Sequence, residues 1–167
     1  MKKTLAITAI GILLLTGCNR LGLGRGELDT EKIQYGMPQD GEVKYGEHGK
    51  ETWFAYGALS GTEGVPANGV AQSHLFEDGR YLNTLQLNIA VAKEGTFYEG
   101  WLVKGTERVT LGHLSNAFGD ARHGLRFEAD NDYSQYLNIE VTLEKDDGNT
   151  APAALVAEGK LKPTKRK

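Results

Sequence analysis

The chain has 167 residues, of which 19 are Lys or Arg, 22 are Asp or Glu, four are His and one is Cys. This length suits one ordinary domain, and a net charge of −3 argues against a nucleic-acid partner because phosphate backbones attract basic surfaces. The lone cysteine excludes a disulfide within the chain.

The first residues follow the order of an export signal. Lys2 and Lys3 supply positive charge, residues 5–15 are mostly apolar, and small residues precede Cys18 in the pattern Leu15-Thr16-Gly17-Cys18. The uncharged run is shorter than the roughly 20 residues that a membrane-spanning helix needs. We therefore expect residues 1–17 to be a lipoprotein signal peptide that is removed.

The pattern around Cys18 predicts a lipid anchor. In bacterial lipoproteins with such a pattern, the cysteine receives acyl chains such as palmitate and becomes the new N-terminus. Its membrane partner would be the outer face of the cytoplasmic membrane or the outer membrane. Cys18 is then expected to be neither a catalytic nucleophile nor a metal ligand.

Two flanking segments are expected to lie outside the folded domain. Residues 18–50 are rich in glycine and charge without a sustained apolar period, which is typical of a flexible tether. Residues 162–167 read as a basic, solvated tail. The domain would then span residues 51–161.

The domain shows a strand period. Within residues 81–89 the apolar Leu85, Leu87 and Ile89 alternate with polar residues, and residues 136–143 alternate in the same way from Leu137 onward. This pattern predicts strands with one buried face. Asp78-Gly79 predicts a hairpin with a type I′ turn. Six more strand candidates complete the set: residues 53–59, 70–77, 97–104, 109–114, 124–128 and 154–161.

No capped amphipathic helix of ten or more residues follows the signal. We therefore expect an all-β domain, an antiparallel β-sandwich of about seven or eight strands. A small β-barrel is the alternative fold.

The sequence contains no motif that predicts catalysis or a cofactor. It lacks a Gly-x-Ser-x-Gly elbow and a phosphate-binding glycine loop that opens a helix. Aromatic residues of the predicted strands are candidates for a ligand groove, although such residues more often fill the core: Trp53, Tyr56, Phe97, Tyr98 and Trp101. A non-catalytic protein is the expectation.

A second interpretation is a metal-binding or enzymatic envelope lipoprotein. It would use the acidic segment 128–132, with Glu128, Asp130 and Asp132, which lacks the glycine and closing glutamate of a calcium loop. It would also use the four histidines, none of which forms a local ligand pair: His48, His74, His113 and His123.

The second half of the chain resembles the extracytoplasmic C-terminal domain of anti-sigma-K factors. The likeness covers residues 69–161 and rests on motifs in a fixed order: Phe97-Tyr98-Glu99-Gly100-Trp101-Leu102-Val103, Leu111-Gly112, Val141-Thr142-Leu143-Glu144, Asp146-Asp147-Gly148 and Ala151-Pro152-Ala153. The resemblance implies an immunoglobulin-like sandwich.

Anchor and resemblance together predict a sensing module that binds an envelope protein or a small ligand and is linked to envelope signalling. Anti-sigma factors hold their sigma partner with a cytoplasmic domain joined through a transmembrane helix. This sequence contains neither part, so we do not expect it to sequester a sigma factor directly.

Overall fold

The computed structural model describes residues 48–164, which form an all-β domain. The all-β, antiparallel prediction is confirmed, because every strand pair in this part of the chain is antiparallel. The strands are β1 (Glu51–Gly61), β2 (Asn68–Phe76), β3 (Tyr81–Asn88), β4 (Thr96–Lys104), β5 (Glu107–His113), β6 (Arg122–Ala129), β7 (Asn138–Lys145), β8 (Ala154–Lys160) and β9 (Lys162–Thr164).

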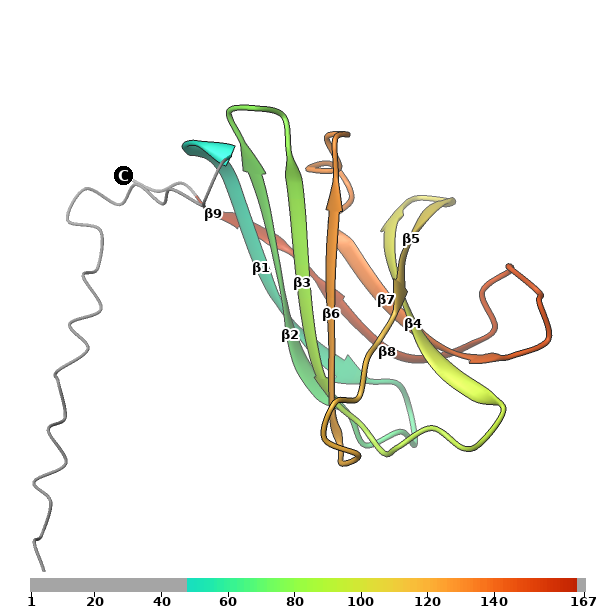
Figure 1. The fold of residues 1–167 in the computed structure, drawn as a ribbon. Coiled ribbons are helices and arrows are strands. Elements are labelled where there is room, and N and C mark those ends of the chain that lie inside the picture. The colour runs from blue at the N-terminus through green and yellow to red at the C-terminus, as the bar shows by residue number, and fades with distance from the viewer. Residues whose placement is uncertain (1–47, 165–167) are drawn as a thin grey trace, which may run out of the picture. The chain divides into compact units, whose positions relative to one another are not determined.

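One continuous sheet connects these strands in the order β5-β4-β7-β8-β1-β2-β3-β6, and β9 also pairs with β1. Strands β1, β2, β3 and β6 lie side by side, and the remaining strands continue the sheet across the core from them (Figure 1). The two end strands, β5 and β6, approach each other at the bridge between Ser115 and Gly124. The sheet therefore nearly closes on itself, which combines features of the predicted sandwich and of the alternative barrel.

The interior is filled by the apolar side of every long strand. Leu85 and Leu87 come from β3, Leu102 from β4, and Ile139 and Val141 from β7, and none of them is more than 1% exposed. These residues belong to one cluster drawn from distant parts of the chain. Alternation with a period of two thus produces one buried and one solvated face on most strands.

A cluster of hydrogen-bonded polar side chains is enclosed in this interior. The Tyr81 hydroxyl donates to Ser73 Oγ at 2.9 Å, and Asn83 Nδ2 donates to the same oxygen at 2.8 Å. All three residues are fully buried, and Asn83 Oδ1 has no hydrogen-bond partner within the described residues. Ser73 on β2 is therefore the shared acceptor of two side-chain hydrogen bonds from β3.

The hairpin predicted at Asp78-Gly79 is present, but its turn type differs from the prediction. Gly79 has a φ of +83°, whereas no non-glycine residue of the described chain has a positive φ. A type I′ turn needs positive φ at both central residues. The Gly79 N–H donates to Phe76 O and the Phe76 N–H to Arg80 O, both at 3.0 Å. This pattern fits a three-residue loop with a glycine bulge.

Both predicted boundaries of the domain move outward. The Glu77 N–H donates to Lys50 O at 3.0 Å, so the described end of the predicted tether joins the sheet. Lys162–Thr164, expected in the basic tail, form β9 and pair with β1. The signal peptide, Cys18 and most of the tether lie outside the described residues. Residues 48–164 contain no helix that is long and apolar enough to cross a membrane.

Candidate functional site

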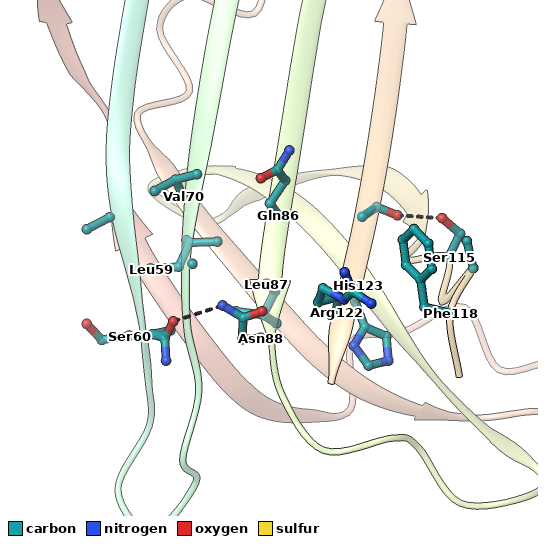
Figure 2. A pocket seen from close by; sticks show the side chains of 15 residues that line it. Leu59, Ser60, Val70, Gln86, Leu87, Asn88, Ser115, Phe118, Arg122 and His123 are labelled. Atoms are coloured by element: carbon teal, nitrogen blue, oxygen red, sulfur yellow. Dashed lines mark hydrogen bonds between the residues drawn. The ribbon is translucent and has the colours of Figure 1, made fainter. Parts of the chain in front are cut away.

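A hollow of about 730 Å³ lies on the solvent-facing side of β1, β2, β3 and β6, next to the loop that joins β5 to β6. Figure 2 shows that its side chains come from all four strands and from this loop. The volume falls within the range of roughly 300–1,000 Å³ that is typical of small-ligand sites. We therefore take this hollow as the candidate binding site.

Strand register builds the base of the hollow from two parallel rows of residues. The first row crosses the sheet as Ser60, Asn68, Asn88 and Arg122, which are direct partners on β1, β2, β3 and β6. Partners in a ladder point to the same face, so these polar side chains stand together. Asn88 Nδ2 donates to Asn68 Oδ1 at 3.1 Å, which joins the two central members.

The second row lies two residues along each strand and supplies a smaller and more apolar surface. It consists of Ala58, Val70, Gln86 and Gly124, again as direct partners across the four strands. Val70 is 48% exposed, which is unusual for a branched aliphatic residue in a sheet. The Gln86 side chain stands beside it (Figure 2). The second row therefore adds the Gln86 amide to an otherwise apolar part of the base.

The loop between β5 and β6 forms the wall, and its own hydrogen bonds fix its shape. Asn116 Oδ1 accepts the Gly119 N–H at 2.6 Å, and Asn116 Nδ2 donates to Asp120 O at 2.6 Å. Ser115 and Gly124 exchange two backbone hydrogen bonds of 2.8 and 2.9 Å. A wall ordered before binding reduces the entropy lost when a ligand binds.

Phe118 and Arg122 stand at the rim of the hollow as a pair. The Arg122 guanidinium lies 4.1 Å from the centre of the Phe118 ring, which is 70% exposed. The same guanidinium donates to Asp120 through Nη2 at 2.6 Å and through Nε at 2.9 Å. This contact holds the pKa of Asp120 below its ordinary value and raises the pKa of Arg122. The charge of Arg122 is thus already paired.

His123 and Ser115 border the hollow, but their reactive atoms are engaged. His123 Nδ1 lies 3.0 Å from Ala121 O, and its Nε2 lies 3.2 Å from Asn116 Nδ2. A carbonyl accepts and an amide nitrogen donates, so this network fits a ring that carries its proton on Nδ1. The Ser115 hydroxyl donates to Gly124 O at 2.9 Å. Neither group is arranged as a nucleophile with a free base.

A smaller hollow of about 480 Å³ lies at the seam between β5 and β6. Its lining includes Leu111 and His113 from β5 and Leu125 from β6, and it shares Gln86 with the larger hollow. At this hollow, β5 and β6 lie apart and are no longer joined as they are at the Ser115–Gly124 bridge.

The four histidines proposed as metal ligands do not form one cluster, although His48 and His74 both pack on the Phe76 ring, at centroid distances of 5.6 and 6.1 Å. His48 Nδ1 contacts Asp78 Oδ2 at 2.8 Å, and His74 Nδ1 contacts Glu51 Oε1 at 2.5 Å. The His113 ring stacks on Phe97 with 3.9 Å between centroids. His123 is held by the loop described above. Residues 48–164 contain no group of three or more His, Cys, Asp or Glu side chains placed to hold a metal ion.

The acidic segment 128–132 is also dispersed. Glu128 contacts Arg126 at 2.5 Å, and Asp130 contacts Arg80 at 3.0 Å. Asp132 Oδ1 accepts the Ser134 N–H at 2.8 Å within its own turn. Each carboxylate thus has its own partner.

The aromatic residues considered for a groove do not converge on one surface. Tyr98 and Trp101 are buried, with hydrogen bonds from the Tyr98 hydroxyl to Ala90 O and from Trp101 Nε1 to Thr142 Oγ1. Trp53 packs near Tyr81, and Phe97 stacks on His113. Tyr56 is 52% exposed and stacks on Phe54.

Apart from His123, which was considered as a metal ligand, the residues that form the hollow were not singled out from the sequence. Asn68, Gln86 and Asn88 are polar residues in strands and look like ordinary solvated positions. Phe118 carried the one usable signal, because it is a large apolar residue in a turn-rich segment, where no strand face would bury it.

Comparisons of the chain with protein-family models, with curated proteins and with solved structures gave no match.

Proposed function

We propose that this protein is a non-catalytic binding module of the bacterial cell envelope, held to a membrane by lipid on Cys18, with the larger hollow as its ligand site. The anchor comes from the sequence pattern that ends at Cys18. The site comes from the hollow on β1, β2, β3 and β6. A sensing role, as in the outer domain of anti-sigma-K factors, belongs to the same proposal.

The observation that carries the proposal is the combination of size and preorganisation at the hollow. Its base is set by strand register, and its wall is tied down by the Asn116 hydrogen bonds. Binding sites of small ligands combine an apolar lining with a few fixed polar groups. Val70 and Phe118 supply the first feature, and the amides of Asn68 and Asn88 supply the second.

Binding without chemistry is favoured by the state of the titratable groups in the hollow. His123 has both ring nitrogens engaged, and Arg122 is paired with Asp120. A general base needs a free nitrogen or carboxylate within reach of the substrate. The lining offers hydrogen-bonding groups in its place.

A variant that fills the hollow tests the proposal. A Cβ added at Gly124 would meet only Leu85 O, at 3.9 Å, so Gly124→Phe places a ring in the hollow without a backbone clash. The processed, lipid-anchored protein is purified from bacterial envelopes in mild detergent, and native mass spectrometry detects bound molecules.

We expect a bound mass on the wild type that is lost in Gly124→Phe and kept in Gln72→Phe. Gln72 is exposed on the same sheet but lies outside the hollow. Thermal melting confirms that both variants fold. A bound mass that persists in Gly124→Phe would contradict the proposal. So would a wild type that carries no bound mass and gains none in the mass spectrum after incubation with envelope extract.

A further inference from the structure

Most polar side chains of the hollow are uncharged, and the amides of Asn68, Gln86 and Asn88 provide both donors and acceptors. After the Asn88-to-Asn68 hydrogen bond, each amide keeps free capacity, since an amide has two donor hydrogens and an oxygen with two lone pairs. The side chains of Gln86 and Ser60 form no hydrogen bond within residues 48–164. The hollow therefore offers a cluster of unused donors and acceptors.

The charges at the hollow are balanced. None of its lining residues is Asp or Glu, so it does not favour a cationic ligand. Its cation, Arg122, already binds the Asp120 carboxylate, and His123 has no free ring nitrogen. An anionic ligand would have to compete with Asp120. This balance favours a neutral ligand.

An entirely apolar ligand fits poorly, because it would bury the Gln86 amide and the remaining donors and acceptors of Asn68 and Asn88 without partners. Each unsatisfied polar group costs about 1–3 kcal/mol. A purely polar ligand would leave the exposed surfaces of Val70 and Phe118 without a contact. The ligand should therefore have hydroxyls at its edges and an apolar C–H face.

A peptide strand is also less suitable. Extended peptides are usually bound at a sheet edge, where backbone groups are free. The hollow lies on the face of the sheet, where the β1–β2–β3–β6 ladders already use those groups. The polar groups available there are side chains on neighbouring strands, which are spaced by about 4.8 Å.

We infer that the hollow binds a neutral oligosaccharide, with sugar hydroxyls on the amides of Asn68, Gln86 and Asn88 and a C–H face of the sugar against Val70 and Phe118. A sugar hydroxyl both donates and accepts, so it matches a mixed row of amide groups. The inference rests on the proposed function and names the chemical class of its ligand.

The test titrates the processed, lipid-anchored protein in mild detergent with defined probes and follows binding by calorimetry. The neutral probes are three trisaccharides: cellotriose, maltotriose and the trimer of β-1,4-linked N-acetylglucosamine. Trigalacturonate is the anionic probe and tetra-alanine the peptide probe. We expect a neutral trisaccharide to bind with a Kd below about 1 mM and more tightly than the other two classes.

Variants locate the site. Gln86→Ala and Phe118→Ala should each weaken trisaccharide binding by about tenfold or more, which corresponds to about 1.4 kcal/mol. Their matched controls, Gln72→Ala and Val91→Ala, remove exposed side chains outside the hollow and should leave the Kd unchanged. Melting temperatures show whether each variant folds.

Three results overturn the inference: no neutral trisaccharide binds, the anionic or peptide probe binds more tightly, or the hollow variants bind as well as their controls. Binding of the peptide or the anion that is lost in Gly124→Phe would overturn the sugar class and keep the proposed function. If no probe binds and native mass spectrometry also finds the hollow empty, both fail.

Discussion

The guanidinium of Arg122 lies 4.1 Å from the centre of the Phe118 ring while it also binds the Asp120 carboxylate. Three residues of one exposed loop and strand start are thus linked. The contact presents the Phe118 ring at the rim of the hollow and pairs the nearest positive charge. It connects the shape of the site with its charge balance.

This link predicts local disorder in Asp120→Ala. Without the carboxylate, the guanidinium is released and the ring loses its cover, so NMR order parameters of Ala117, Phe118 and Gly119 should fall. The melting temperature should barely change, because the pair is exposed to solvent. Asp147→Ala, in another exposed turn, is the control. A large loss of thermal stability would show that the pair supports the fold as well.

The buried hydrogen bonds at Ser73 give a stability prediction. Ser73→Ala removes the acceptor of both Tyr81 and Asn83, and the free energy of unfolding should fall by about 2–4 kcal/mol. Tyr81→Phe removes only one donor and should cost about 1 kcal/mol. Urea unfolding of the two variants measures this order. Equal losses would mean that Ser73 is not the shared acceptor.

Tyr81 also predicts a dependence on alkaline pH. Burial raises the pKa of its hydroxyl from 10.0 to about 12. Between these values the unfolded chain releases the proton while the folded chain keeps it, so the stabilisation is present below pH 10 and disappears as pH rises through 12.

Urea midpoints measured at increasing alkaline pH should therefore fall more steeply in the wild type than in Tyr81→Phe. The variant keeps Tyr98 and Tyr136, whose pKa values are also raised, so it still falls with pH. If the urea midpoints of the two proteins fell in parallel with pH, ionisation of Tyr81 would not contribute to the alkaline loss of stability.

The strands were predictable because their signal is local. A period of two located β3 and β7, since one face of each must be buried. Turn residues separated the other six strand candidates. β9 gave no such signal, because Lys162-Pro163-Thr164 is short, polar and contains a proline. Its pairing with β1 depends on where Leu161 enters the core, at 1% exposure. The burial of Leu161 depends on tertiary packing, which a local sequence pattern does not encode.

The site was not predictable for the same physical reason. Asn68 and Asn88 lie twenty residues apart and meet because β2 and β3 pair in one particular register. Sequence reasoning considered individual aromatic residues as groove candidates, but the structure buries two of them, Tyr98 and Trp101, in the interior. The anchor at Cys18, which a contiguous pattern carries, stays a prediction.

A close backbone contact predicts that Gly57 tolerates no side chain. A Cβ there would lie 2.4 Å from Lys160 O, at the junction where β8 gives way to β9 beside β1. Gly57→Ala should therefore lower stability by about 1–3 kcal/mol through a forced backbone shift. Gly124→Ala has open space and should stay within about 0.5 kcal/mol of the wild type. Thermal melting compares the two.

The lipid anchor is tested through Cys18 itself. Cys18→Ser removes the thiol that would carry the acyl chains, so labelled palmitate should no longer enter the protein. In detergent phase partitioning, the variant should move from the detergent phase to the aqueous phase. Asn19→Ser is the neighbouring control and should still be labelled. Because one acyl chain gives only marginal membrane binding and stable anchoring needs more, loss of every chain should abolish retention. Retention of unlabelled Cys18→Ser in the detergent phase would instead place the membrane contact elsewhere in the chain.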